Sequence, residues 1–372
     1  MKNLIINRYA MFNDNKAPKW IVLQLVEKCN LRCKMCYQWG ETGSYLDFGK
    51  ENLKLLSFEV IKDIINDCGD TKPYIGLYGG EPLMHPEIFE ILRFLKEKEI
   101  KTYIDTNGTL NEKNAEKLID SKVDLLWISL DGPPDINDRQ RGNGVYKRVI
   151  KGIDRISYLK NQRNVTTPKL GISLTVTPLN YAYINELFFD NLDLSQIGSI
   201  SIELQNFATA EEHSEYAKIL NEEFELNTTA PIAKGLVQDP AIFSEMDTVL
   251  ITSQLVRLKE ACIERGINFN SSLKTLEPSN FKSYFEGNWN EMGDKKHHCS
   301  FPLTYAEITA KGDVVVCHTF YDHILGNVYE TGFNAIWNGE KLKKLRSYLR
   351  KQLLPICTAC CRYYYNPASG TN

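Results

Sequence analysis

Short apolar runs alternate with longer amphipathic stretches along the first half of the chain. Stretches with helical spacing separate the apolar runs, near Phe58–Asp67, Glu87–Lys98, Glu112–Ile119, Tyr146–Leu159 and Tyr181–Phe189. The apolar runs themselves lie at Trp20–Leu25, Tyr74–Tyr78, Lys101–Ile104, Leu125–Leu130, Lys169–Val176 and Ile197–Leu204. This alternation is typical of βαβ units, which place their strands in a parallel sheet. We therefore predict an α/β fold built as a partial (β/α)6 TIM-like barrel, with its chemistry at the carboxyl ends of the strands.

The pattern changes after residue 206. Helical spacing returns at Ala208–Phe224, Phe243–Arg265, Phe333–Asn338 and Glu340–Leu349, and the short strand Val314–Val316 follows a Lys-Gly-Asp turn. We predict a core barrel within residues 1–235, a helical bridge over residues 236–290, and a small cysteine-rich hairpin-and-helix domain over residues 291–372.

Composition narrows the class of protein. The 372 residues carry 44 basic and 47 acidic side chains, so a net charge of −3 gives no strong drive toward nucleic acid or an anionic membrane. No apolar run reaches the roughly 18 residues that a membrane span needs. The segment Met1–Arg8 does not resemble a secretory signal, so we expect a cytoplasmic protein.

Ten cysteines are the informative part of the composition. Cys68 and Cys262 lie on helical stretches, where we expect them to be buried apolar residues. The other eight form two groups toward the chain ends. In a reducing compartment such groups indicate metal or iron–sulfur ligation rather than disulfides.

The first group is Cys29, Cys33 and Cys36, spaced C-x3-C-x2-C directly after the first predicted strand. Four thiolates normally close a [4Fe–4S] cubane, so three leave one iron open to an added molecule. A structural zinc site is the alternative, although no fourth local ligand is present.

This spacing, followed by Tyr37, resembles the signature of radical S-adenosylmethionine (SAM) enzymes. The resemblance implies that the three cysteines hold a [4Fe–4S] cluster and that SAM chelates its open iron. It also implies that one electron splits SAM into methionine and a 5′-deoxyadenosyl radical, which abstracts hydrogen from a substrate.

Further motifs follow the second, third and fourth predicted strands and resemble the same family in order. The resemblance implies SAM contacts from Tyr37, Gly79, Gly80, Glu81, Asn107, Ser129, Asp131 and Arg141. Glu81 would accept from the SAM amino group, and Arg141 would pair with the SAM carboxylate. Plain turns at the Gly-Gly and Asn-Gly pairs, a loop cap at Asp131 and a solvated Arg141 are the alternatives.

The second group resembles the twitch or SPASM extension of radical SAM enzymes. The resemblance is carried by Gly312–Cys317, Ile324–Val328, Ile336–Gly339 and the pair Cys357 and Cys360. It implies one auxiliary [4Fe–4S] cluster, held by Cys299, Cys317, Cys357 and Cys360, which would transfer electrons. Cys361 could replace Cys360 or act as a hydrogen donor. A zinc ribbon, with His297, His298 or His318 as other ligands, is the alternative.

Together these motifs predict a radical SAM oxidoreductase with two [4Fe–4S] clusters and SAM as cofactors. A ribosomal peptide or protein and a sugar-like small molecule remain open as substrates. No peptide-recognition segment fits before Cys29, so a peptide would be delivered by a separate protein. A flavodoxin or ferredoxin would supply electrons. The alternative class is a non-enzymatic iron–sulfur carrier or a zinc-stabilised scaffold.

Overall fold

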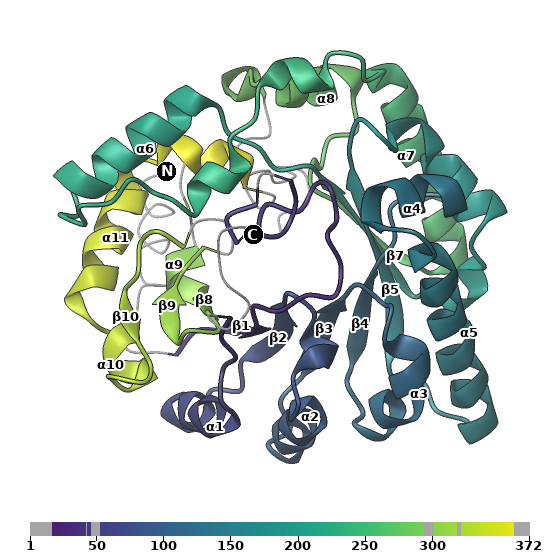
Figure 1. Cartoon of the computed structure of the whole chain (residues 1–372), viewed down its shortest axis with the longest axis horizontal. Coiled ribbons are helices and arrows are strands. Elements are labelled where there is room, and N and C mark those ends of the chain that lie inside the picture. Colours follow the sequence, from purple (N-terminus) through teal and green to yellow (C-terminus); the bar gives the residue numbers. More distant parts are fainter. Residues whose placement is uncertain are drawn as a thin grey trace, which may run out of the picture.

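A computed structural model describes residues 17–41, 43–45, 53–292, 299, 301–317 and 321–360 of the chain. Within these residues the strands form one mostly parallel ten-stranded sheet (Figure 1). The strands are β1 (Trp20–Val26), β2 (Tyr74–Gly79), β3 (Thr102–Thr106), β4 (Leu125–Ser129), β5 (Lys169–Val176), β6 (Ser199–Leu204), β7 (Asn268–Ser271), β8 (Tyr305–Ile308), β9 (Asp313–Val315) and β10 (Gly326–Asn327).

The sheet order is β10-β9-β8-β1-β2-β3-β4-β5-β6-β7, so consecutive strands from β1 to β7 are neighbours and all run parallel. The two edge strands β7 and β10 do not pair with each other within the described residues. This open, curved sheet with crossover helices confirms the predicted α/β class and its partial barrel.

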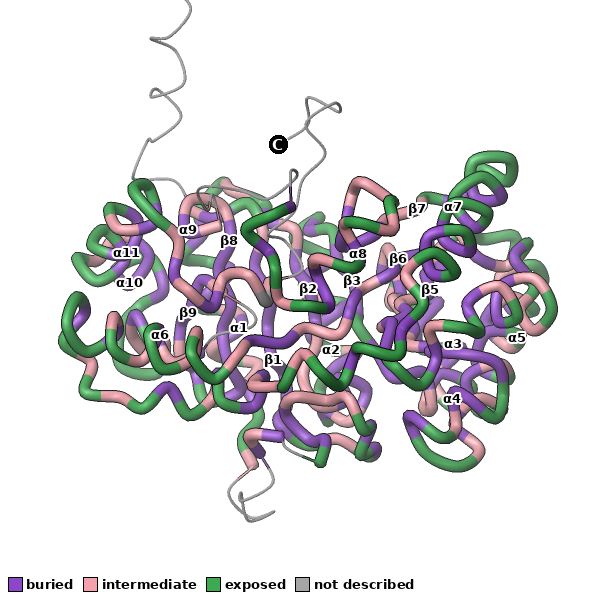
Figure 2. Tube along the Cα trace, turned by 90° about the horizontal axis from the view of Figure 1, so that it is seen from above, coloured by how far each residue is buried: buried purple, intermediate pink, exposed green. Residues whose placement is uncertain are grey.

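Helices α1, α2, α3 and α5 cover the outer face of the arc of strands (Figure 1), whereas α4 lies in front of the strands in that view and near the lower edge of Figure 2. The helices are α1 (Phe58–Asp67), α2 (Ile88–Glu97), α3 (Asn111–Asp120), α4 (Pro134–Arg141), α5 (Val145–Arg163), α6 (Ala210–Glu222), α7 (Thr248–Arg265), α8 (Pro278–Phe285), α9 (Phe301–Thr304), α10 (Phe333–Trp337) and α11 (Glu340–Lys351). Their buried aliphatic residues pack against Ile21, Leu23 and Leu77 of the strands in one large core. None of the helices in the described part of the chain is long and apolar enough to cross a membrane.

Two features of the sheet differ from the sequence-based expectation. Residues 236–290, expected to be helical, also contain β7, which pairs in parallel with β6. Its Asn-Phe-Asn-Ser sequence has low β-propensity, so the apolar pattern did not reveal it. The C-terminal cysteine-bearing region also joins the same sheet, because β8 pairs in parallel with β1.

The stretch Tyr181–Phe189 was expected to be a helix and is not an α-helix. It forms a 3₁₀ turn at Tyr181–Tyr183 and a π-helical turn at Glu186–Asp190. The hairpin predicted around Gly312 is present, because β8 and β9 pair in antiparallel fashion.

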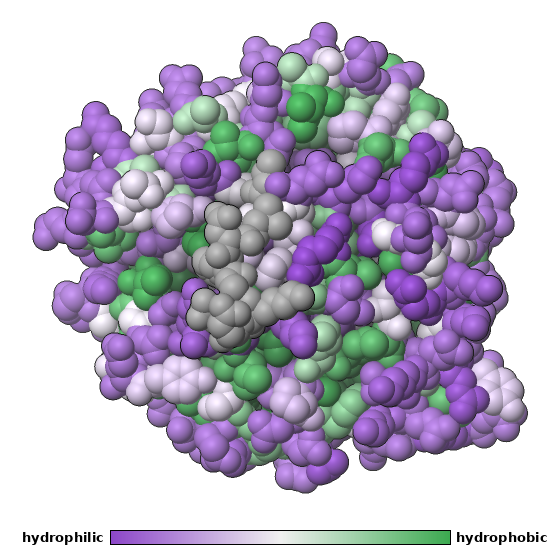
Figure 3. Space-filling view, viewed as in Figure 1, coloured by the Kyte–Doolittle hydropathy of each residue, from purple (hydrophilic) through white to green (hydrophobic). Residues whose placement is uncertain are grey.

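A separate aromatic cluster fills the inner face of the sheet at the amino ends of the strands. Val22, Tyr103 and Tyr305 are buried there with Trp20 and Tyr74 against them. The ring centroids of Trp20 and Tyr305 lie 5.0 Å apart, and those of Tyr74 and Tyr103 lie 4.9 Å apart. Because this aromatic cluster lies at the amino ends of the strands, the polar side chains lie toward the carboxyl ends. On the face seen in Figure 3, hydrophilic residues dominate and hydrophobic ones form small scattered patches.

Candidate functional site

The loop that follows β1 carries three thiols, and each has a nitrogen donor beside its sulfur. The Leu31 N–H donates to Cys29 Sγ at 3.4 Å, and the Trp39 N–H donates to Cys36 Sγ at 3.3 Å. Arg141 Nη1 lies 3.9 Å from Cys33 Sγ. Burial raises the pKa of Cys33 to about 11, against the opposite effect of Arg141. A donor set of cysteine sulfurs with N–H groups directed at them fits the thiolates of an iron–sulfur cluster.

The glycine pair after β2 holds this loop by backbone contact. The Gly80 N–H donates to the Val26 carbonyl at 2.8 Å, and the Glu81 N–H donates to the Lys28 carbonyl at 3.0 Å. A Cβ on Gly80 would lie 2.2 Å from the Lys28 oxygen, and Gly79 has a φ of 145°. The close approach that these glycines permit is therefore to the backbone of the cysteine loop.

Glu81 is completely buried and joins the ends of β2 and β3. Its Oε1 accepts from the Leu83 N–H at 3.1 Å and from the Thr106 hydroxyl at 2.8 Å, and its Oε2 accepts from the Asn107 N–H at 2.8 Å. Burial raises the pKa of Glu81 to about 7, although these hydrogen bonds act to lower it. The Asn107 side chain in turn donates to Asn30 Oδ1 at 2.8 Å and lies 3.9 Å from Cys29 Sγ. Asn107 thus faces the cysteine loop.

Asp131 and Arg141 form a buried ion pair beside Cys33. Arg141 Nε donates to Asp131 Oδ2 at 2.5 Å, and Asp131 Oδ1 accepts from the Thr175 N–H at 2.9 Å. Arg141 is therefore not a solvated surface residue, and Asp131 links the end of β4 to β5 and α4. The Asp131 carboxylate holds the Arg141 guanidinium in position beside Cys33 of the cysteine loop.

Ser129 begins a row of polar residues across the inner face of the sheet. It is in register with Ser173, which is in register with Ser201, and Ser201 is in register with Asn270. In-register residues of parallel strands share a face, and the neighbouring residues Ile128, Ile172 and Ile202 belong to the helix-facing core. The row therefore lines the inside of the barrel.

A hydrogen-bonded network extends over the inner face of β6 and β7 and the residues that follow β7. We call it the polar wall, and its members are Ser201, Glu203, Asn270, Ser272 and Lys274. Glu203 accepts from the hydroxyls of Ser201 at 2.8 Å and Ser272 at 2.7 Å. Lys274 Nζ donates to Asn270 Oδ1 at 2.5 Å. None of these residues was singled out from the sequence, because neither β7 nor the pairing of β6 with β7 was predicted.

Tyr37 belongs to a second group that the sequence did not reveal, formed by Glu307 and four tyrosines. Glu307 is fully buried and accepts from the hydroxyls of Tyr78, Tyr305 and Tyr321. Burial raises the pKa of Tyr37 well above its ordinary value, and the nearby Tyr321, Glu307 and Cys36 raise it further. The sequence contains one indication of this group, because Glu307 is an acidic residue within the otherwise apolar stretch Tyr305–Ile308.

The C-terminal thiols come together from three segments. Cys299 precedes α9, Cys317 follows β9, and Cys357 and Cys360 lie in and after the 3₁₀ turn Pro355–Ala359. Burial raises the pKa of Cys357 well above its ordinary value, and the nearby Cys299 and Cys317 act in the same direction. The Cys360 N–H donates to the Cys357 carbonyl at 3.1 Å. This all-thiol donor set also fits an iron–sulfur cluster.

No three Cys, His, Asp or Glu side chains in the described part of the chain lie close enough together to hold a single metal ion. Cys68, directly after α1, and Cys262, in α7, are buried, as expected for apolar packing. The expectations for Cys361, His297, His298 and His318 fall outside the described residues.

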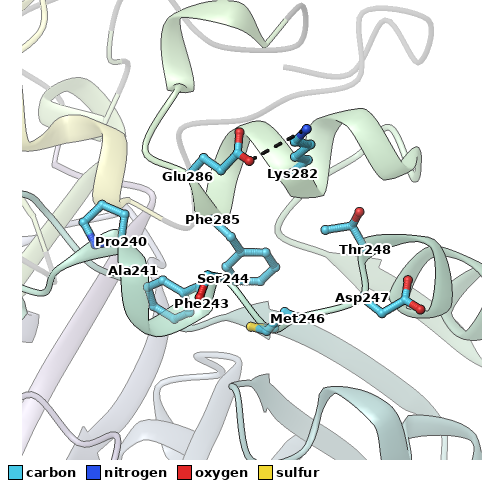
Figure 4. Close-up of a pocket in the computed structure, with 10 residues that line it drawn as sticks. All are labelled: Pro240, Ala241, Phe243, Ser244, Met246, Asp247, Thr248, Lys282, Phe285 and Glu286. Atoms are coloured by element: carbon cyan, nitrogen blue, oxygen red, sulfur yellow. Dashed lines mark ion pairs between the residues drawn. The ribbon is translucent and has the colours of Figure 1, made fainter.

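The structure also has a surface pocket of about 480 Å³ where the start of α7 meets α8 (Figure 4). Phe243, Met246 and Phe285 line its floor, and Lys282 pairs with Glu286 at 3.9 Å on its rim. It contains none of the cysteines or the residues after β2 to β4, so it is separate from the candidate site.

Two known protein families match parts of this chain. The radical SAM superfamily matches residues 23–167, and an iron-sulfur cluster-binding domain, SPASM, matches residues 299–361. The chain therefore carries a radical SAM domain and, C-terminal to it, a SPASM domain. It is an enzyme whose cofactors are SAM and iron–sulfur clusters.

Two relatives align with nearly the whole chain. The tungsten-containing aldehyde ferredoxin oxidoreductase cofactor-modifying protein of Pyrococcus furiosus is 23% identical over 362 residues, which cover 92% of this chain and 87% of the relative. The AdoMet-dependent heme synthase of Methanosarcina barkeri is 26% identical over 346 residues, which cover 90% and 87%.

Two solved structures share the fold. Streptococcus suis SuiB bound to precursor peptide SuiA has a TM-score of 0.61 at 19% identity, covering 95% of this chain and 76% of SuiB. AnSMEcpe with bound AdoMet has a TM-score of 0.56 at 17% identity, covering 93% and 85%. At these identities the likeness establishes the fold alone.

Proposed function

We propose that Cys29, Cys33 and Cys36 hold a [4Fe–4S] cluster at which this enzyme cleaves SAM reductively. The radical formed by this cleavage would act on a polar substrate inside the barrel. When bound, this pair of cofactors supplies a 5′-deoxyadenosyl radical, which takes a hydrogen atom from a substrate C–H bond to give 5′-deoxyadenosine. The observation that carries the proposal is the cysteine loop at the mouth of the barrel, with a nitrogen donor at every sulfur.

The SAM side of the site would be formed by Tyr37, Gly79, Gly80, Glu81, Asn107, Ser129, Asp131 and Arg141. Glu81, Asp131 and Arg141 already make hydrogen bonds to the protein, so their main task is to hold the strand ends and the cysteine loop in place. Glu81 Oε2 accepts one bond from Asn107, which leaves acceptor capacity for an ammonium group. Ser129 is half-buried on the inner face, where it can reach a bound ligand.

Cys299, Cys317, Cys357 and Cys360 would hold one auxiliary [4Fe–4S] cluster with no open iron. Electron transfer is its proposed task, because a fully ligated cluster cannot chelate a substrate without losing a thiolate. A flavodoxin or ferredoxin would supply the electrons. A reducing cytoplasm suits the nine described cysteines, which form no disulfide with one another.

The substrate would be a peptide or protein, or a sugar-like small molecule. The polar wall supports this choice, because its carboxylate, hydroxyls, amide and ammonium offer hydrogen bonds rather than a large apolar surface. The relative SuiB has been solved with a precursor peptide, and a separate recognition protein could deliver one here. Oxidation, epimerisation and bond formation are all compatible with this site.

The test is formation of 5′-deoxyadenosine by anaerobically reconstituted, reduced protein. Host extract would be divided into a small-molecule pool and a peptide pool, with a tetrapyrrole as a third arm because some relatives are heme synthases. Stimulation by either polar pool supports the proposal and selects the substrate class. Stimulation by the tetrapyrrole alone would overturn the polar-substrate part.

Alanine at Cys29, Cys33 and Cys36 separates an enzyme from a carrier or scaffold. We expect about eight irons per parent chain from two four-iron clusters, and about four in the triple variant, with no 5′-deoxyadenosine formed. Cys68→Ala is the matched control, because this buried thiol donates to the Ile64 carbonyl within α1 and should leave iron content unchanged. Four irons with one zinc in the parent would contradict the auxiliary cluster.

A further inference from the structure

Glu307 is a buried carboxylate at which separate parts of the chain meet. It lies on β8, and its Oε2 accepts from the Tyr305 hydroxyl at 2.6 Å. Its Oε1 accepts from Tyr78, at the end of β2, and from Tyr321, which follows β9. The hydroxyls of Tyr78 and Tyr321 also bond to each other. The hydroxyls thus engage both carboxylate oxygens.

Neighbouring residues connect this carboxylate to both thiol groups. Tyr37 is within electrostatic range of both Glu307 and Cys36, and Tyr305 is within range of both Glu307 and Cys317. Glu307 is in register with Val315 of β9, two residues before Cys317. It also accepts from Tyr321, which is hydrogen-bonded to Tyr37, the residue after Cys36. Glu307 therefore has a short structural connection to one cysteine of each thiol group.

The three donated hydrogen bonds favour the charged form of Glu307, and its complete burial acts in the opposite direction. Burial raises the pKa values of Tyr305 and Tyr321 well above the ordinary value for tyrosine, so both hydroxyls stay protonated as donors. Hydrogen bonds donated to a carboxylate stabilise its ionised form. A negative charge in a water-poor interior acts on its neighbours more strongly than one in solvent.

We propose that Glu307 lowers the reduction potentials of the metal groups held at both thiol sites, by placing one fixed negative charge near both of them. Net charge and hydrogen bonding near a cluster are among the factors that set its potential, and a nearby negative charge disfavours an added electron. The inference rests on the proposed clusters being held by these cysteines. It adds a potential-setting residue that does not itself ligate a metal.

The test is the midpoint potential of each cluster, followed by electron paramagnetic resonance in a redox titration without substrate. In Glu307→Gln, which keeps the shape and removes the charge, both midpoints should shift to more positive values. Glu307→Asp keeps the charge and should remain near the parent. Glu203→Gln is the matched control, because Glu203 also accepts from two hydroxyls but lies on β6, across the barrel.

Unchanged midpoints in Glu307→Gln protein that holds both clusters, shown by its iron content and Mössbauer spectrum, would overturn the proposal. If Glu307→Gln fails to assemble, Tyr305→Phe serves instead. It removes the donor to Oε2 and leaves Tyr78 and Tyr321 at Oε1, so the less compensated charge should move both midpoints to more negative values. Unchanged or more positive midpoints would then refute the inference.

The two proposals fail separately. The titration needs no substrate and no turnover, so it reports on Glu307 even when no pool stimulates 5′-deoxyadenosine formation. Parent protein that holds no four-iron clusters would instead refute the proposed function itself.

Discussion

The ion pair between Asp131 and Arg141 gives the sharpest prediction for the stability of the site. We consider Asp131→Asn, which keeps the size of the side chain and can keep a carbonyl acceptor for the Thr175 N–H. The substitution places an amide donor, or an uncharged oxygen, opposite Arg141 Nε. Arg141 then remains a buried cation without its anionic partner.

The burial of both partners sets the magnitude. Asp131 is 0% exposed and Arg141 is 8% exposed, and their closest atoms are 2.5 Å apart. Removing one partner of such a buried pair costs about 3–5 kcal/mol, because the remaining charge stays desolvated. The exposed pair of Arg163 and Asp120, which are 36% and 68% exposed, is worth less than about 1 kcal/mol by comparison.

The assay is urea unfolding of the metal-free protein under anaerobic, reducing conditions. Asp131→Asn should lower the free energy of unfolding by about 3–5 kcal/mol, whereas Asp120→Asn should change it by less than about 1 kcal/mol. The double variant Asp131→Asn/Arg141→Met removes both charges and should recover part of the loss. A loss below about 1 kcal/mol for Asp131→Asn would refute the claim that this pair is energetically coupled.

Three further predictions concern neighbouring residues. Gly80→Ala should lower the iron content associated with the first cysteine group, because its Cβ would meet the Lys28 carbonyl at 2.2 Å; full iron loading would contradict this. Burial raises the pKa of Glu81 to about 7, so the unfolding free energy of the wild-type protein should fall relative to that of Glu81→Gln as pH rises from about 4.5 to 7, by about 3 kcal/mol at most. Parallel pH profiles of the two proteins in urea unfolding would refute this prediction. Burial lowers the pKa of His323 to about 4, so wild-type protein should lose stability relative to His323→Phe as pH falls from about 6.5 to 4; a constant difference in unfolding free energy would refute it.

Local features of this protein could be predicted from the sequence because they depend on neighbouring residues. The spacing of Cys29, Cys33 and Cys36 places three thiols in one loop, and that loop lies after β1 as expected. The amphipathic stretches at Phe58–Asp67 and Glu340–Leu349 form helices because their apolar faces recur with the helical period. The parallel α/β class followed from the alternation of such elements.

The same reasoning placed Gly79, Glu81 and Arg141 at the ends of strands or helices. It did not predict which residues they contact. The sequence suggested that the glycine pair allows close approach to a ligand, and the structure shows close approach to the backbone of residues 26–28. It left Arg141 open between a ligand contact and a solvated residue, and the structure shows an ion pair with Asp131. Each of these partners comes from a different element of the barrel.

Tertiary structure alone decided which distant segments share a sheet and a face. The pairing of β8 with β1 brings Glu307 to Tyr78, residues separated by 229 positions, and the pairing of β7 with β6 builds the polar wall. Neither pairing has a local signature, since a strand's neighbour is chosen by the packing of the whole sheet. Hydrophobic period and ligand spacing act over a few residues, whereas the surroundings of Glu307 depend on contacts between strands that are far apart in the sequence.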